Sequence, residues 1–164
     1  MSIILGIDPG SLVTGYGVIK AHNQHDLEYL DSGCIRLQGK SLAQRLKQIH
    51  DSLCDLIAQF QPNEAAIEEV FVSVNLGGAL KLGQARGAAI TTLMRFNIEP
   101  QEYSARQVKQ AVVGYGAATK EQIQQMVMTL LKLPKAPAKD AADALAIAIC
   151  HINMQKYRQR ISQC

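Results

Sequence analysis

The sequence has 164 residues, the length of one ordinary domain, and its 48% hydrophobic and 19% charged residues give a globular composition. Its apolar stretches are too short to span a bilayer, and its N-terminus lacks the basic flank and apolar region of a signal peptide. The four cysteines share no short spacing, so neither a zinc knuckle nor a disulfide framework is indicated. We therefore expect a reduced, cytoplasmic protein without a membrane segment.

The net charge of +3 is unevenly distributed along the chain. Residues 1–72 hold five Lys or Arg and nine Asp or Glu, whereas residues 73–139 hold nine basic and three acidic residues. A basic half beside an acidic half is typical of proteins that bind nucleic acid. Solvated surface charge with a chance imbalance is the alternative explanation.

Three strands are predicted at the start of the chain. Residues 3–8 form a short apolar run that ends in an acid, and Pro9 and Gly10 break it. Residues 15–20 are predicted to form the return strand, and the alternating pattern of residues 28–36 predicts a third strand. The three lie close enough in sequence to form an antiparallel meander.

Helices and strands alternate in the middle of the chain. Apolar residues at steps of three and four predict an amphipathic helix from Leu42 to Phe60, ended by Pro62. A buried strand is predicted at residues 65–70, a helix at residues 76–96 despite four glycines, and a last strand at residues 98–103.

Three helices complete the predicted order. The first two begin with capping boxes, Ser104 with Gln107 and Thr119 with Gln122, and the third runs from Asp140 to about residue 155. The order β-β-β-α-β-α-β-α-α-α predicts an α/β fold with a five-stranded mixed sheet flanked by helices. We expect a single domain at residues 1–156 and a short, loose basic tail at residues 157–164.

Four acidic residues occupy positions where their side chains can converge. Asp8 ends the first strand, Glu68 lies in an otherwise apolar strand, and Asp140 and Asp143 are three residues apart in the first turn of the last helix. Strand alternation lets only one of Glu68 and Glu69 face Asp8. A carboxylate in an apolar strand is costly without a partner, but capping of the helix explains Asp140 equally well.

Carboxylates this close repel one another unless a cation lies among them. Mg²⁺ or Mn²⁺ fits such a set of oxygen ligands, and the scattered histidines and cysteines offer no transition-metal site. Two such ions would activate a water and stabilise the leaving 3′-oxygen at a phosphodiester. The acids therefore favour a metal-dependent nuclease.

Five motifs in this order resemble the RuvC family of Holliday-junction resolvases, within the ribonuclease-H-like superfamily of nucleases and integrases. Each motif is weak alone, but their succession is specific and covers nearly the whole chain. The motifs are residues 5–10 (LGIDPG) with 14–17 (TGYG), 66–71 (AIEEVF), 79–87 (ALKLGQARG), 105–110 (ARQVKQ) and 140–146 (DAADALA).

The resemblance implies a ribonuclease-H-like fold and a homodimer that binds a four-way DNA junction during homologous recombination and DNA repair. It implies paired, symmetric nicks in strands of like polarity that leave 5′-phosphate and 3′-hydroxyl ends, and a RuvA–RuvB branch-migration complex as partner. The family's catalytic and metal-binding acids match Asp8, Glu68, Asp140 and Asp143, which would hold two Mg²⁺ per subunit, with Mn²⁺ as a substitute.

The resemblance also implies DNA-binding residues. Lys109 and Lys120 match the family's functionally important lysines and would neutralise phosphates, and Arg86 lies in the third motif. Phe71 matches a junction-facing aromatic residue that would stack on an unpaired base. Without the resemblance, Phe71 would be interpreted as a core residue and the two lysines as solvated helix charges.

Two further patterns bear on assembly and DNA affinity. Ala79, Gly83 and Gly87 form a smooth stripe that fits close helix approach in a dimer, or equally well packing against the domain's own sheet. Leu12 stands where the family often has a basic residue, and residues 73–75 lack a frequent lysine. These missing charges predict weaker phosphate contacts, and so a lower affinity or a stronger need for low salt.

Three other functions compete with the nuclease. The Asp8 loop is similar to the phosphate loop of actin-like ATPases and sugar kinases, but the chain has no room for their second domain. A ribonuclease H acting on RNA–DNA hybrids is disfavoured by the Asp140/Asp143 helix and the Arg86 segment. A non-catalytic junction-binding module would leave four acids together, which is costly without a metal.

Overall fold

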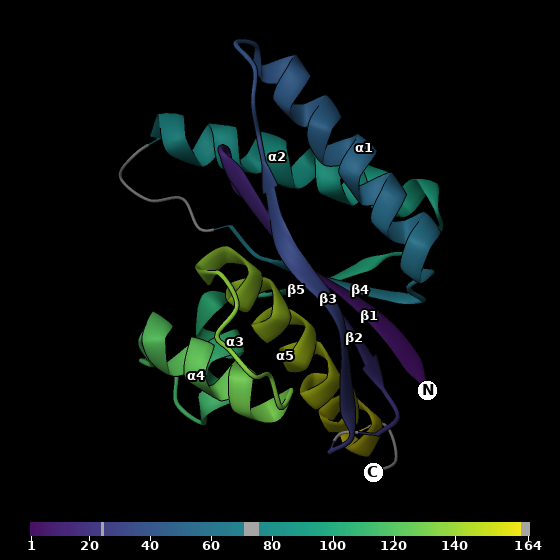
Figure 1. Cartoon of the computed structure of the whole chain (residues 1–164), viewed down its shortest axis with the longest axis vertical. Helices are drawn as coiled ribbons and strands as arrows, with labels where there is room; N and C mark the ends of the chain where they lie inside the picture. Colours follow the sequence, from purple (N-terminus) through teal and green to yellow (C-terminus); the bar gives the residue numbers. More distant parts are fainter. Residues whose placement is uncertain (24, 71–75, 162–164) are drawn as a thin grey trace.

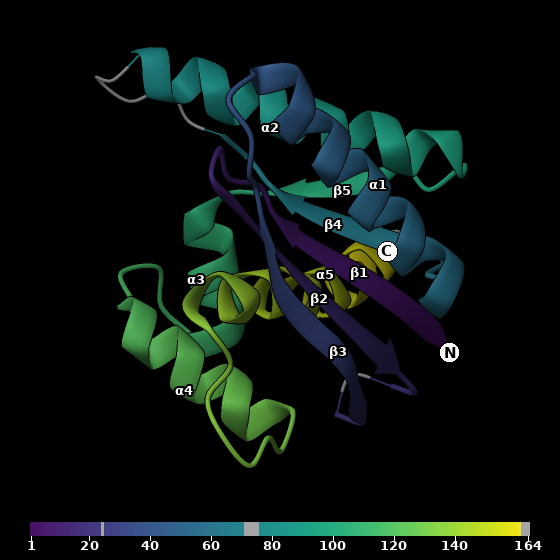
Figure 2. The ribbon, with the colours of Figure 1, turned by 45° about the horizontal axis from the view of Figure 1, so that its top comes forward.

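The structure, a computed structural model, describes residues 1–23, 25–70 and 76–161, the last six of them by backbone alone. In these residues a five-stranded sheet lies between two layers of helices (Figures 1 and 2). The strands are β1 (Ser2–Asp8), β2 (Val13–Ala21), β3 (Leu27–Arg36), β4 (Glu64–Glu68) and β5 (Pro100–Tyr103).

The sheet is mixed, with the strand order β3-β2-β1-β4-β5. β2 pairs antiparallel with both β1 and β3, as the short connections predict, whereas β4 lies parallel to β1 and β5 lies parallel to β4. The predicted α/β fold with a five-stranded mixed sheet is confirmed. Because β1, β4 and β5 are parallel, their carboxyl ends lie at one edge of the sheet, the usual place for ligands in such folds.

Each face of the sheet is covered by its own helices. α1 (Leu42–Phe60) and α2 (Leu76–Arg95) pack on one face, and α3 (Ala105–Val113), α4 (Lys120–Leu130) and α5 (Lys139–Ile161) lie on the other (Figure 2). Strand alternation divides the core accordingly. On β1, Leu5 and Ile7 pack towards α1 and α2, while Ile4 packs towards α5.

The predicted helix starts are confirmed at both capping boxes. The Ser104 and Thr119 side chains accept hydrogen bonds from the backbone N–H three residues later, and the backbone N–H of each cap residue donates to the side-chain oxygen of that glutamine. Ser41 and Gln44 form a third capping box, at the start of α1. That pair satisfies the same pattern and was missed in the sequence.

Several element boundaries differ from the prediction, and two of the differences have a clear physical cause. β5 begins at Pro100 rather than residue 98, because the Ile98 N–H donates to the Leu93 carbonyl at the end of α2 and Asn97 adopts a φ of 58°. α5 continues to Ile161 instead of ending near residue 155, since no Gly or Pro interrupts it. Whether residues 157–164 act as a separate tail stays a prediction.

The small-residue stripe of α2 faces away from the other residues that the structure describes. A Cβ built on Gly83 or Gly87 would have no atom of the described residues within 4 Å. Leu76 and Leu80, on the same side of the helix, are 72% and 65% exposed. Packing against the domain's own sheet therefore does not explain this stripe.

None of the helices in the described ranges is both long enough and apolar enough to cross a membrane.

Candidate active site

Asp8 and Glu68 come together at the carboxyl ends of two neighbouring strands. Ile7 of β1 pairs with Ile67 of β4 in the parallel register, so the next residue of each strand lies side by side with its counterpart. Alternation turns both carboxyl groups towards α5, on the side opposite to Ile7 and Ile67. Glu69 is exposed, and its backbone N–H donates to the Tyr103 carbonyl. Strand geometry thus places Glu68, rather than Glu69, beside Asp8.

Glycines allow α5 to approach this edge of the sheet closely. A Cβ on Gly6 of β1 would lie 2.1 Å from the Ala144 carbonyl oxygen, and one on Gly15 of β2 would lie 2.1 Å from that of Asp140. Any side chain at these positions would push the helix away. The glycines therefore bring the first turn of α5, with Asp140 and Asp143, against the ends of β1 and β2.

One pocket combines most of the predicted site. Asp8, Glu68 and Asp143 line it together with Lys109 of α3 and Lys120 of α4. Its apolar wall comes from the three helices on this face, through Ala105, Val108, Ile123 and Ile147. Asp140 is not part of the lining, but its charge acts on Asp8. We refer to this site as the acidic pocket.

The electrostatics of the acidic pocket are dominated by crowded carboxyl groups. Burial, the charges of Glu68 and Asp143 and a hydrogen bond with Glu68 raise the pKa of Asp8 to about 8. Burial also raises the pKa of Glu68, although the hydrogen bond from Asp8 opposes this. At neutral pH the pair therefore holds a proton, with Asp8 as donor and Glu68 as acceptor.

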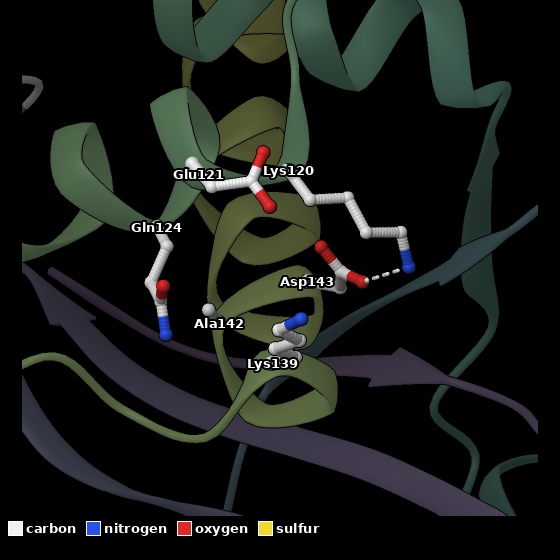
Figure 3. Close-up of a pocket in the computed structure, with 6 residues that line it drawn as sticks. All are labelled: Lys120, Glu121, Gln124, Lys139, Ala142 and Asp143. Carbon is white, nitrogen blue, oxygen red and sulfur yellow. Dashed lines mark hydrogen bonds and ion pairs between the residues drawn. The ribbon is translucent and has the colours of Figure 1, made fainter.

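Lys120 supplies positive charge at the mouth of the acidic pocket. Its ammonium group donates to the Asp143 carboxylate at 3.1 Å, and this contact raises the pKa of Lys120 (Figure 3). The lysine side chain is 68% exposed, whereas that of Asp143 is 24% exposed. Figure 3 also shows Glu121 and Gln124 of α4 and Lys139 of α5 around a shallow notch beside this ion pair.

The donor set of the acidic pocket fits a hard divalent cation. Carboxylate oxygens are the ligands that Mg²⁺ and Mn²⁺ prefer, and a cation among them would relieve the repulsion that keeps a proton on Asp8. Within the described ranges, no three acidic, His or Cys side chains are already gathered closely enough to hold a metal ion. Asp143 points to Lys120 instead, so ligation would require that carboxylate to turn towards Asp8.

The other predicted DNA-binding residues are placed differently. Arg86 of α2 lies on the opposite face of the sheet, where its guanidinium group is paired with Glu102 of β5. This arrangement fastens α2 to the sheet and keeps Arg86 out of the acidic pocket. Phe71 lies outside the residues that the structure describes, as do residues 73–75.

A buried polar network behind the acidic pocket was not predicted. His151 of α5 is 3% exposed; its ring contacts the Tyr103 hydroxyl at 3.0 Å and the Glu64 carboxylate at 2.7 Å. Ser2 donates to the same carboxylate at 2.6 Å, and Gln155 also bonds to it. Burial raises the pKa of Glu64, but these hydrogen bonds outweigh it and leave the pKa lowered. The network ties α5 to β1, β4 and β5.

Comparisons with known proteins agree with this arrangement. The family model described as crossover junction endodeoxyribonuclease RuvC matches residues 4–151. Proteins of that name from Aliivibrio salmonicida (strain LFI1238) and Vibrio vulnificus (strain CMCP6) are each 58% identical over 156 residues, which is 95% of this chain and 90% of theirs.

A solved structure is also similar over nearly its full length. Thermus thermophilus RuvC in complex with a Holliday junction substrate superposes with a TM-score of 0.90 and 31% identity, covering 96% of this chain and 97% of that one. The resemblance carried by the five motifs is thereby confirmed. The chain belongs to the RuvC family of crossover junction endodeoxyribonucleases.

Proposed function

We propose that this protein is a structure-specific endonuclease that resolves four-way DNA junctions in homologous recombination and DNA repair. It makes paired, symmetric nicks and leaves 5′-phosphate and 3′-hydroxyl ends. The observation that carries the proposal is the acidic pocket, where Asp8, Glu68 and Asp143 face two lysines at the carboxyl ends of parallel strands. Membership of the RuvC family supports the junction as substrate.

The catalytic and metal-binding residues of the proposed reaction are Asp8, Glu68, Asp140 and Asp143. Two Mg²⁺ per subunit, or Mn²⁺ in their place, would supply activation of the attacking water and neutralisation of charge at phosphorus. The four acids come from β1, β4 and α5, so rigid elements fix their positions. Asp8 would lose its proton on binding a metal ion, because a cation favours the charged form of its ligands.

Lys109 and Lys120 bind the phosphates next to the cleaved bond. Both side chains line the acidic pocket, and Lys120 is sufficiently exposed to exchange Asp143 for a phosphate oxygen. Charge-assisted hydrogen bonds to phosphate position the strand without reading its sequence. We further propose that Phe71 stacks on a base near the crossover, while Arg86 acts indirectly by holding α2.

The protein acts as a homodimer through the exposed stripe of α2. Leu76 and Leu80 give this stripe an apolar end, and Gly83 and Gly87 let a second helix approach closely. A two-fold dimer presents two identical sites to a junction of near two-fold symmetry, which accounts for paired nicks. We also infer a cytoplasmic location, a nuclease domain at residues 1–156, a basic tail after it, and cooperation with RuvA–RuvB.

A cleavage panel tests this function against a ribonuclease H and a non-catalytic binding module. The wild-type protein and Asp8→Asn are incubated with Mg²⁺ and either a mobile four-way junction, a linear duplex or an RNA–DNA hybrid. We expect paired nicks that ligase can seal in the junction only, and none with the variant. Cleavage of the hybrid would instead identify a ribonuclease H, and binding without cleavage would identify a binding module.

A further inference from the structure

A second groove lies outside the acidic pocket, between the edge strand β3 and the loop that joins α4 to α5. Tyr29, Ser32, Cys34 and Arg36 line it from β3, and Lys135 and Pro137 line it from the loop. Two of the residues that line this β3 groove are cationic and none is acidic. The lining of the β3 groove is therefore positive, whereas the acidic pocket combines three acids with two lysines.

The β3 groove begins next to the acids of α5. Ala141 lines the groove, whereas Asp143, two residues further along the same helix, lines the acidic pocket. Gly15 of β2, which touches the backbone of Asp140, is paired with Cys34 of β3. The first turn of α5 thus separates the β3 groove from the acidic pocket, and a strand that crosses it would contact both.

The two cations of the β3 groove are available to a ligand. Arg36 and Lys135 are both exposed. In the part of the chain that the structure describes, neither forms an ion pair, in contrast to Lys47, which is paired with Asp51. A pair of solvated cations beside a groove without acids complements a ligand with repeated negative charge.

The walls of the β3 groove are fixed before any ligand binds. Pro134 and Pro137 restrict the backbone of the loop, and the Gln124 side chain donates to the Pro137 carbonyl at 2.6 Å, which fastens the loop to α4. On the opposite wall, the hydroxyl groups of Tyr29 and Ser32 lie 3.1 Å apart. Hydroxyl groups on a rigid wall are suited to hydrogen bonds with phosphate oxygens, with little entropy lost on binding.

We propose that the β3 groove binds the phosphodiester backbone of one arm of the junction, with Arg36 and Lys135 as its phosphate contacts. This proposal rests on the nuclease function, because it continues the path of the same DNA from the acidic pocket across the first turn of α5. The contacts hold the arm without reading its sequence, since they reach phosphates rather than base edges.

The salt dependence of junction binding tests the two cations. Affinity is measured between 0.05 and about 0.3 M salt, a range in which each phosphate contact contributes about 0.9 to the slope of log K against log salt. For the double variant Arg36→Gln/Lys135→Gln we expect a slope of log K against log salt that is shallower by about 1.8. The variant should bind the junction about 60-fold more weakly at about 0.1 M salt. Lys47→Gln, on the opposite face, is the matched control and should bind like the wild type.

Cys34 offers a second readout that depends on position. It lines the β3 groove and is partly exposed, whereas Cys54, also partly exposed, lies on α1 across the sheet. Alkylation with a maleimide, followed by mass spectrometry, should slow at Cys34 but not at Cys54 when junction DNA saturates the protein. Both readouts use the full-length protein, and urea denaturation checks that the double variant is folded.

The outcomes separate this proposal from the nuclease function. If wild-type protein nicks the junction, but the double variant keeps the wild-type slope and Cys34 is alkylated equally with and without DNA, the β3 groove is not the path of an arm. If the double variant loses slope and DNA protects Cys34 while no substrate is nicked, the groove proposal stands and the nuclease function falls.

Discussion

Replacing Asp8 with asparagine keeps the shape of the side chain and its ability to donate to Glu68, but removes a carboxyl group in a crowded acidic site. Burial and neighbouring charges raise the pKa of this carboxyl group from 3.8 to about 8 in the folded protein. Between pH 3.8 and about 8, Asp8 holds a proton in the folded chain but has lost it in the unfolded chain. The free energy of unfolding of the metal-free wild type therefore falls as pH rises through this window.

The size of the effect follows from the pKa difference. At pH 7 the wild type loses at most about 4 kcal/mol of unfolding free energy to this effect. Each pH unit above the pKa of Asp8 in the unfolded chain contributes about 1.4 kcal/mol. Asp8 is half-buried rather than enclosed, and water at the pocket mouth relaxes part of this cost. We expect the metal-free Asp8→Asn variant to be about 2 kcal/mol more stable than the wild type at pH 7, and about equally stable near pH 4.

The assay is urea denaturation with EDTA from pH 4 to 9 on wild type, Asp8→Asn and the control Asp55→Asn, an exposed position on α1. The difference between wild type and Asp8→Asn should grow with pH and level off above pH 8, and Asp55→Asn should follow the wild type. Adding Mg²⁺ should stabilise the wild type at high pH, but not the variant. A stability difference that does not change with pH would refute the raised pKa of Asp8 in the folded protein.

Five other substitutions have defined outcomes. Lys120→Gln should lower the single-turnover nicking rate about 100-fold, whereas junction affinity should fall only about 8-fold at about 0.1 M salt, the loss expected for one phosphate contact. His151→Leu should lower the free energy of unfolding in urea by about 3 kcal/mol, because the Glu64 carboxylate and the Tyr103 hydroxyl each lose a hydrogen bond to the buried imidazole. Gly15→Ala should cost about 1–3 kcal/mol and reduce nicking by displacing α5, whereas Gly83→Ala, which meets no neighbour within 4 Å, should leave the stability of the fold unchanged or higher. Leu80→Asp should produce monomers in sedimentation velocity, and a variant that stays dimeric would exclude the α2 stripe as the interface.

The sequence was most informative where local pattern and chemistry coincide. Short apolar runs predicted β1 and β4, and strand alternation left only one of Glu68 and Glu69 to face Asp8. The family resemblance then selected Glu68, and the parallel pairing of the two strands places it beside Asp8. Capping boxes predicted the starts of α3 and α4, because both residues of each box lie within four positions of one another. For Asp140 and Asp143, the helical repeat alone was enough to predict that both carboxyl groups lie on one face of the helix.

Features that depend on distant segments could not be read in this way. His151 meets Glu64 across 87 positions, and neither residue carries a local signal of the other. The β3 groove brings Arg36 to Lys135 across the whole middle of the chain. Gly6 and Gly15 looked like ordinary strand glycines until α5 was seen to lie against them. The alternation of Gly15 and Gly17 on one face of β2 was the one available signal of such close approach.

The central claim is that the four acids hold the divalent cations that drive cleavage of the junction. It is tested most directly by single-turnover nicking of a labelled junction across a series of Mg²⁺ concentrations, with wild type and Asp8→Asn, and with binding measured in Ca²⁺ for both. We predict a nicking rate that rises with Mg²⁺ and vanishes in EDTA, and a loss of at least about 1,000-fold in the variant at equal junction affinity. Nicking by the wild type in EDTA, or a variant that cuts at the wild-type rate, would contradict the claim.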